Sequence, residues 1–134
     1  MIAKILLADD DELARAAIKL LLSDRTDLKI IAEAADGEEA VEKAKIECPD
    51  VAIVDISMPR MNGIQAAMEI LRFSPTMLVL TDSLYDVRIL IIQLKEIGVR
   101  GFISKARLAT DLIPAIEIAL GGGTCFGIEV AQPA

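Results

Sequence analysis

The sequence feature that most constrains the fold is a regular alternation between two kinds of apolar segment. Short aliphatic runs occupy residues 5–8, 28–32, 51–54, 77–80 and 101–104. Longer segments with the spacing of amphipathic helices lie at residues 11–23, 37–47, 62–73, 84–97 and 109–120. Strands that alternate with helices pair in parallel through right-handed crossovers. Because the strands are continuous apolar runs, helices should cover both sheet faces. The pattern predicts an α/β fold, a three-layer, doubly wound, five-stranded parallel sheet.

Composition narrows the class of protein further. The 134 residues fit one domain, and a hydrophobic content of 54% excludes a disordered chain. Charged residues interrupt every apolar stretch before the roughly 18 residues that a membrane-spanning helix needs. A net charge of −7 argues against direct binding of nucleic acid. We therefore expect a cytoplasmic domain without a membrane partner, in which the distant Cys48 and Cys125 are inert thiols.

Polar side chains that can carry chemistry follow four of the five predicted strands. Asp9 and Asp10 follow the first strand, Asp55 the third, Thr81 the fourth and Lys105 the fifth. The carboxyl ends of parallel strands meet at one edge of the sheet, where open α/β folds bind their ligands. We therefore expect these five side chains to form one cluster.

The chemistry that this set predicts is phosphoryl transfer to a carboxylate. Carboxylates held close together repel one another and recruit a cation, and a chain without histidine offers the oxygen ligands that suit Mg²⁺. Asp55 can act as the nucleophile on phosphorus and form an aspartyl phosphate. Lys105 would balance charge on the phosphoryl oxygens, and Thr81 would donate a hydrogen bond to one of them.

The sequence resembles the receiver domains of two-component response regulators from residue 3 to about residue 122. The stretches that carry the resemblance are ILLADD (5–10), DVAIVDISMPRMNG (50–63), LT (80–81) and GFISK (101–105). The resemblance implies a flavodoxin-like receiver fold that is phosphorylated by a sensor histidine kinase and is not a turnover enzyme. It implies Asp55 as phosphoacceptor and a magnesium site formed by Asp9, Asp10, Asp55 and the backbone carbonyl of Ser57. In this site Asp10 would ligate Mg²⁺ directly and Asp9 through water.

The same resemblance assigns further residues to a switch. Thr81 matches the switch hydroxyl, Lys105 the phosphate-facing lysine and Phe102 the rotating aromatic of the family. Asp82 departs from the family pattern, because receivers usually carry a small uncharged residue there. We expect solvent to screen its carboxylate, which then weakens phosphate binding by about 1 kcal/mol or less. Thr81 and Asp82 are also suitable caps for the next helix, as Asp11 is for the first.

The predicted helix 84–97 has two apolar stripes. One stripe can face the sheet and comprises Val87, Leu90, Ile91 and Leu94. The other, formed by Tyr85, Ile89 and Ile92, has no sheet to cover it. Exposed apolar patches of this kind mark interfaces, so we expect this stripe to contact a second subunit or an output domain. The alternative is a solvated, over-hydrophobic helix.

The C-terminal residues predict a connector to a further domain. Three glycines at 121–123 end the last helix. The segment GGGTCFGIEV (121–130) resembles the connector to a DNA-binding helix-turn-helix in the NarL/LuxR-like subfamily. We expect a receiver domain at 1–122 and a connector at 123–134, whose Phe126, Ile128 and Val130 are too apolar for a solvated tail. DNA would then be bound only by an output domain that this chain lacks.

Three other functions remain open at this stage. A haloacid-dehalogenase-like phosphatase would use Asp9 as its nucleophile, within the Asp9-x-Asp11 spacing, but leaves Asp55 unexplained. A pseudo-receiver would keep the fold and never accept phosphate. A stand-alone receiver would act through protein contacts without any output domain.

Overall fold

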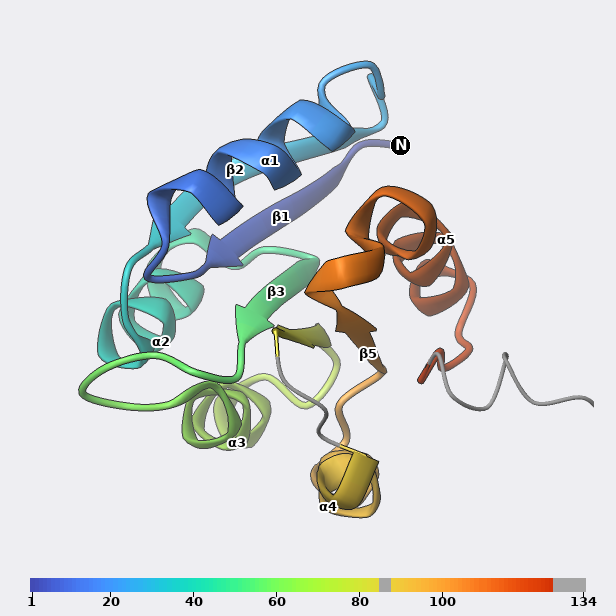
Figure 1. Ribbon diagram of the computed structural model, residues 1–134. Helices are drawn as coiled ribbons and strands as arrows, with labels where there is room; N and C mark the ends of the chain where they lie inside the picture. Colours follow the sequence, from blue (N-terminus) through green and yellow to red (C-terminus); the bar gives the residue numbers. More distant parts are fainter. Residues whose placement is uncertain (85–87, 127–134) are drawn as a thin grey trace, which may run out of the picture.

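The computed structural model, described at residues 1–84 and 88–126, is a parallel sheet covered by helices (Figure 1). Within the described residues the strands are β1 (Ala3–Ala8), β2 (Leu28–Ala34), β3 (Val51–Asp55), β4 (Leu78–Ser83) and β5 (Gly101–Ser104). They are hydrogen-bonded in the order β2-β1-β3-β4-β5, and every pair is parallel. The prediction of a doubly wound five-stranded parallel sheet is confirmed.

Helices cover both faces of this sheet, because successive strand residues point to opposite sides. One core cluster joins the sheet to α2 (Gly37–Glu47), α3 (Gly63–Phe73) and α4 (Ile91–Ile97). The other cluster joins it to α1 (Glu12–Leu22) and α5 (Leu108–Leu120). Among the described residues, no helix is both long enough and apolar enough to cross a lipid bilayer.

Polar caps fix where the first three helices begin. Asp11 accepts a hydrogen bond from the backbone N–H of Leu13, as predicted for a cap of α1. Asp36 accepts one from the backbone N–H of Glu39 at the start of α2. Each cap pairs a helix N–H group that has no partner inside the helix. Because these helices follow β1, β2 and β3, the caps also fix the loops at the carboxyl edge of the sheet.

Two expectations about the fourth strand and fourth helix are wrong. β4 continues to Ser83, so Thr81 and Asp82 lie inside the strand and start none of the described helices. The ladder holds them there, since the backbone N–H of Ile56 donates to the carbonyl of Asp82 at 2.9 Å. In place of a helix over 84–97, the described residues form a 3-10 turn (Arg88–Leu90) followed by the seven-residue α4.

The two stripes of the fourth helix are separated as expected where they are described. Ile91 and Leu94 are buried against the sheet, whereas Ile89 and Ile92 are 89% and 71% exposed. Tyr85 and Val87 lie outside the described residues, as do Ile128 and Val130 of the expected connector.

Candidate functional site

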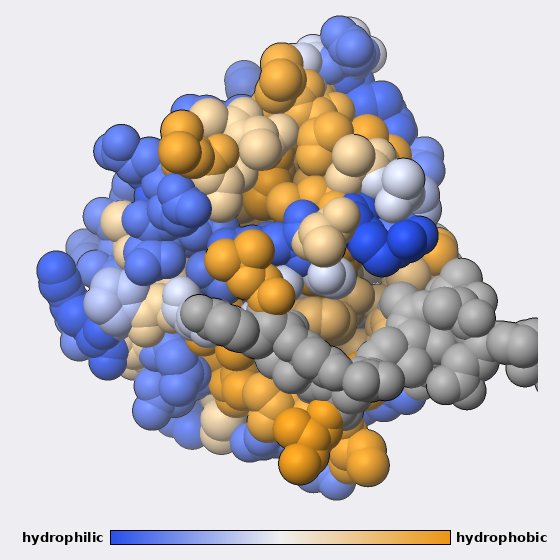
Figure 2. Space-filling model, in the orientation of Figure 1, coloured by the Kyte–Doolittle hydropathy of each residue, from blue (hydrophilic) through white to orange (hydrophobic). Residues whose placement is uncertain are grey.

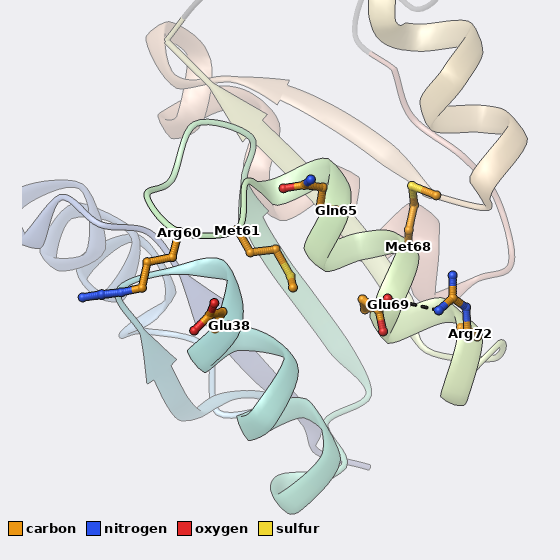
Figure 3. A pocket seen from close by; sticks show the side chains of 7 residues that line it. All are labelled: Glu38, Arg60, Met61, Gln65, Met68, Glu69 and Arg72. Carbon is orange, nitrogen blue, oxygen red and sulfur yellow. Dashed lines mark hydrogen bonds and ion pairs between the residues drawn. The ribbon is translucent and has the colours of Figure 1, made fainter.

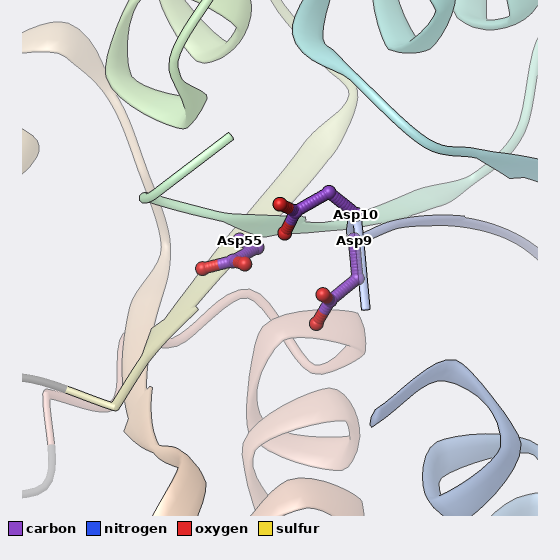
Figure 4. Close-up of side chains that lie close together, drawn as sticks. All are labelled: Asp9, Asp10 and Asp55. Atoms are coloured by element: carbon purple, nitrogen blue, oxygen red, sulfur yellow. The ribbon is translucent and has the colours of Figure 1, made fainter. Parts of the chain in front are cut away.

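Three aspartates meet at the carboxyl edge of the sheet, as the strand order requires (Figure 4). Asp9 and Asp10 directly follow β1, and Asp55 is the last residue of the neighbouring β3. One carboxylate oxygen from each lies within 4.8 Å of the others. Asp9 and Asp55 are buried, while Asp10 is exposed. The predicted convergence of these carboxylates is therefore present.

The Lys105 ammonium neutralises part of this negative charge. Lys105 follows β5, and its Nζ lies 2.7 Å from Asp9 Oδ2 and 3.1 Å from Asp55 Oδ2. Its side chain is only 7% exposed, so water screens these two ion pairs weakly. The ammonium consequently bridges two strand ends that are 46 residues apart in sequence.

A cleft gives access to this edge. It has a volume of about 280 Å³ and is lined by Asp10, Asp11, Asp55, Ser57, Leu84 and Lys105. The backbone N–H of Ser57 donates to Asp55 Oδ1 at 3.1 Å, which orients that carboxylate. A second hollow of about 270 Å³ lies between α2 and α3 (Figure 3). It is bordered by Arg60, Met61 and helix side chains such as Glu69 and Arg72 and contains none of the predicted site residues.

The loop between β3 and α3 holds Asp55 in place through a close backbone approach at Gly63. The Gly63 N–H donates to the carbonyl of Ile56 at 2.9 Å. A Cβ at position 63 would lie 2.1 Å from the carbonyl oxygen of Asp55, so only glycine fits without moving the strand. Met58 of the same loop is buried in the core, and Asn62 forms a capping box with Gln65. These contacts give Met58, Asn62 and Gly63 each a structural role in the loop that follows Asp55.

The predicted switch residues lie opposite each other in the sheet. Thr81 of β4 pairs in register with Phe102 of β5, and both are buried. The Thr81 hydroxyl donates to the backbone carbonyl of Gly101 at 3.0 Å. Phe102 packs in the cluster beneath α4. Thr81 and Phe102 are therefore adjacent, so a movement of one side chain can displace the other.

Asp82 is not screened by solvent, and that expectation is wrong. It pairs in register with Asp55 across β3 and β4, so the two side chains emerge on the same face of the sheet. Asp82 is 1% exposed, and neither of its carboxylate oxygens has a hydrogen-bond partner among the described residues. The site thus contains a fourth, buried carboxyl group.

Burial and mutual repulsion shift the proton equilibria of this cluster. Burial, followed by the charge of Asp9, raises the pKa of Asp55 to about 6. Burial raises the pKa of Asp82 to about 7, and the attraction of Lys105 only partly opposes this. Burial lowers the pKa of Lys105, but the hydrogen bond to Asp9 and the negative charges around it outweigh burial and raise its pKa overall.

The donor set fits a hard divalent cation. It offers carboxylate oxygens and no nitrogen or sulfur ligand, which is the chemistry that Mg²⁺ accepts, and the exposed Asp10 leaves room for the waters that Mg²⁺ retains. A doubly wound parallel sheet with an acidic pair, an aspartate and a lysine at its carboxyl edge defines the class of receiver-type α/β domains. Residues 5–117 match the family model of the response regulator receiver domain, and the chain belongs to that family.

Known proteins similar to this chain agree with that assignment. Transcriptional regulatory protein PdtaR of Mycobacterium tuberculosis is 39% identical over 119 residues, which cover 87% of this chain and 56% of PdtaR. Transcriptional regulatory protein DegU of Brevibacillus brevis is 32% identical over 129 residues, which cover 96% of this chain and 55% of DegU. The chain thus spans little more than half the length of these relatives.

Solved structures show the same architecture. A LuxR-family two-component response regulator from Aurantimonas sp. SI85-9A1 superposes with a TM-score of 0.91 at 27% identity, covering 98% of this chain and 94% of that one. The receiver domain of NarL from Mycobacterium tuberculosis superposes with a TM-score of 0.82 at 30% identity, covering 90% and 98%. The resemblance to the NarL/LuxR-like receivers is thereby confirmed.

Sequence reasoning missed two features of the site, the burial of Asp82 and the role of Gly101 as acceptor for Thr81. A signal for the first was available, because only Thr81 separates Asp82 from the apolar run 77–80. No sequence signal marks the second, since a hydrogen bond between neighbouring strands depends on register.

Proposed function

We propose that this chain is the cytoplasmic phosphoacceptor domain of a two-component response regulator, phosphorylated on Asp55 by the phosphohistidine of a sensor histidine kinase. The observation that carries the proposal is the Lys105 ammonium held between Asp9 and Asp55 at the rim of an accessible cleft. Such a cation can pair with the Asp55 carboxylate before transfer and with the phosphoryl group on that carboxylate after transfer.

Mg²⁺ would be held by the carboxylates of Asp10 and Asp55 and by the backbone carbonyl of Ser57, with Asp9 acting through water. Bound there, it would supply charge neutralisation for an incoming phosphoryl group. Two observations support this assignment: the carboxylate oxygens are grouped within 4.8 Å, and Ser57 lines the same cleft as Asp10 and Asp55.

The chain's own residues would perform the transfer mostly by position and charge. A carboxylate oxygen of Asp55 forms the new bond to phosphorus, while the bond from phosphorus to the histidine nitrogen breaks and its electron pair stays on that nitrogen. Lys105 then pairs with a phosphoryl oxygen, and Thr81 turns its hydroxyl toward another. The domain accepts one phosphoryl group and does not turn over a substrate.

Replacement of Asp55 tests this function directly. The Asp55→Asn variant should take up no label from a phosphorylated histidine kinase or from a small acyl phosphate with Mg²⁺ present. Asp24→Asn is a matched control, because Asp24 is exposed and does not line the cleft. Label on Asp55→Asn at the wild-type rate would contradict the assignment, and label mapped to Asp9 would favour the phosphatase alternative.

A second candidate, a pseudo-receiver that never accepts phosphate, is favoured by one observation. Asp82 places a buried carboxyl group beside the phosphoacceptor, where an ionised carboxylate repels a phosphoryl group. Asp82→Ala should therefore bind beryllofluoride, a phosphoryl mimic, with Mg²⁺ more tightly than wild type, by roughly tenfold for each 1.4 kcal/mol of repulsion removed. Wild-type protein that takes up neither label nor mimic, even at high concentration, would establish the pseudo-receiver reading.

We further propose that α4 presents a partner surface. Apolar side chains gather at the α4 end of the molecule (Figure 2), and Ile89 and Ile92, in and just before α4, are exposed. Tyr85, expected in the same stripe, lies outside the described residues. The partner would be a second receiver or an output domain following the connector at 123–134. Because the relatives named transcriptional regulators are nearly twice as long, that output would bind DNA and this domain would regulate it.

A further inference from the structure

Residues 122–126, which we call the edge segment, pair with the outer side of β5 at Cys125. β5 is the last strand in the sheet order, so this side would otherwise be an open edge. The backbone N–H of Cys125 donates to the carbonyl of Arg100 at 2.9 Å, and the N–H of Phe102 donates to the carbonyl of Cys125 at 2.9 Å. These bonds form a parallel bridge between Gly101 and Cys125. The segment therefore adds to the sheet after α5 has ended.

A buried aromatic side chain anchors the edge segment. Phe126 is fully buried, in the same core cluster as Phe102 and Leu94. The Lys95 Nζ of α4 lies 5.1 Å from the centroid of its ring. A register that continues from the bridge at Cys125 places Phe126 opposite Phe102, on the same face of the sheet. The edge segment thus connects the predicted switch aromatic with α4.

The sequence of β5 leaves space for this segment. A Cβ at Gly101 would lie 2.5 Å from the carbonyl oxygen of Cys125 and 3.0 Å from Leu80 Cδ2. A side chain at position 101 would therefore displace the edge segment. The glycine at position 101 and the burial of Phe126 are two independent observations that support a specific contact between the edge segment and β5.

Gly101 also joins the edge segment to the phosphoacceptor site. The Gly101 carbonyl accepts a hydrogen bond from the Thr81 hydroxyl at 3.0 Å. The neighbouring Arg100 carbonyl and Phe102 N–H bond to the backbone of Cys125. A hydroxyl has one proton to donate, so Thr81 cannot bond Gly101 and a phosphoryl oxygen at once. When Thr81 turns to a phosphoryl group, the buried Gly101 carbonyl loses the hydroxyl that bonds it alongside the β4–β5 ladder, which weakens the attachment of β5 to β4 at this position and favours a shift of β5.

We propose that the edge segment is a phosphorylation-sensitive contact. It stays bound to β5 while the Thr81 hydroxyl donates to Gly101, and it loosens when that hydroxyl donates to a phosphoryl group on Asp55 instead. The inference rests on the proposed phosphoacceptor function and deepens it. Residues 122–126 would then transmit the phosphorylation state of Asp55 to any segment that follows them in the chain. By linkage, a change that favours the loosened segment also favours phosphoryl binding.

Alkylation of Cys125 reports on this contact without any substitution. Cys125 is half-buried in the segment, and the exposed Cys48 at the end of α2 is an internal reference. The wild-type chain is alkylated with and without Mg²⁺ and beryllofluoride, and each thiol is followed by peptide mass mapping. We expect beryllofluoride to raise the rate at Cys125 roughly fivefold or more, the lower end of measured couplings, and to leave Cys48 unchanged.

Two glycine variants give a matched comparison. Gly101→Ala should speed alkylation of Cys125 without ligand and also tighten beryllofluoride binding. Gly121→Ala should do neither, because its Cβ would meet no atom closer than 3.5 Å and its φ of −82° suits alanine. Phe126→Ala removes the anchor and replaces Gly101→Ala if that variant does not fold.

The outcomes separate this inference from the function on which it rests. Beryllofluoride that binds without changing Cys125 alkylation would overturn the coupling and leave the phosphoacceptor function intact. A Gly101→Ala or Phe126→Ala protein with faster Cys125 alkylation but wild-type affinity for beryllofluoride would overturn it as well. Failure of beryllofluoride to bind the wild-type chain and both variants would overturn the proposed function and the coupling together.

Discussion

Replacing Asp82 with asparagine should remove a large part of a pH dependence of stability that wild-type protein shows between pH 4 and pH 7. Burial raises the pKa of Asp82 from 3.8 to about 7 in the folded protein, whereas the unfolded chain keeps an ordinary value. The folded state therefore binds more protons than the unfolded state across this interval. The free energy of unfolding then falls as the pH rises.

The magnitude follows from the two pKa values. Each pKa unit corresponds to 1.36 kcal/mol, so ionising Asp82 costs the folded state up to about 4 kcal/mol by pH 7.5. The asparagine side chain of the variant would have a desolvation cost of its own, but that cost does not change with pH. Asp55, whose pKa is raised to about 6 by burial and by the charge of Asp9, contributes the same sign in both proteins. The difference between the two pH profiles therefore reports the ionisation of Asp82 together with its coupling to Asp55.

The assay is urea unfolding of wild type and Asp82→Asn, followed by circular dichroism at intervals from pH 4.5 to pH 8 in the presence of a chelator. No histidine titrates in this range, because the chain contains none. The stability of Asp82→Asn relative to wild type should rise steadily with pH and level off above pH 7.5. A stability difference that is constant across this range would refute the reasoning, because it would mean that Asp82 is ionised equally in both states.

Three further variants test other parts of the structure. Lys105→Met leaves buried carboxylates without their cation and should cost about 3 kcal/mol at pH 7.5 and less at pH 5, measured by urea unfolding; equal stability at both pH values would contradict this. Gly63→Ala forces a backbone clash and should destabilise by about 2 kcal/mol or more, whereas Gly121→Ala should have a much smaller effect; similar unfolding midpoints would count against it. Ile89→Asp with Ile92→Asp should leave stability within about 0.5 kcal/mol, since both side chains are exposed, and should abolish association in a longer protein measured by sedimentation. Unaltered association and solubility would show that this stripe is not an interface.

The amino-acid sequence by itself determined the sheet and most of the candidate site. Continuous apolar runs alternating with helical segments permit few arrangements other than parallel strands with helices on both faces. Parallel strands place their carboxyl ends at one edge, and Asp9, Asp55 and Lys105 could be assigned to it before any contact was known. The cap at Asp11 was equally predictable, because a side chain and a backbone two residues away decide it.

Tertiary structure alone decided the environment of Asp82 and the course of the chain after α5. The end of β4 is set by hydrogen bonds from β3 and β5, not by the apolar run, so the ladder carries a polar aspartate into a buried position. The docking of Phe126 depends on the open edge of β5, on the space at Gly101 and on the core beneath α4. Each of these lies more than 20 residues away in sequence. Local sequence patterns indicate helix or strand propensity and the periodicity of apolar residues. The burial of Asp82 and Phe126 instead depends on contacts between segments that are distant in sequence.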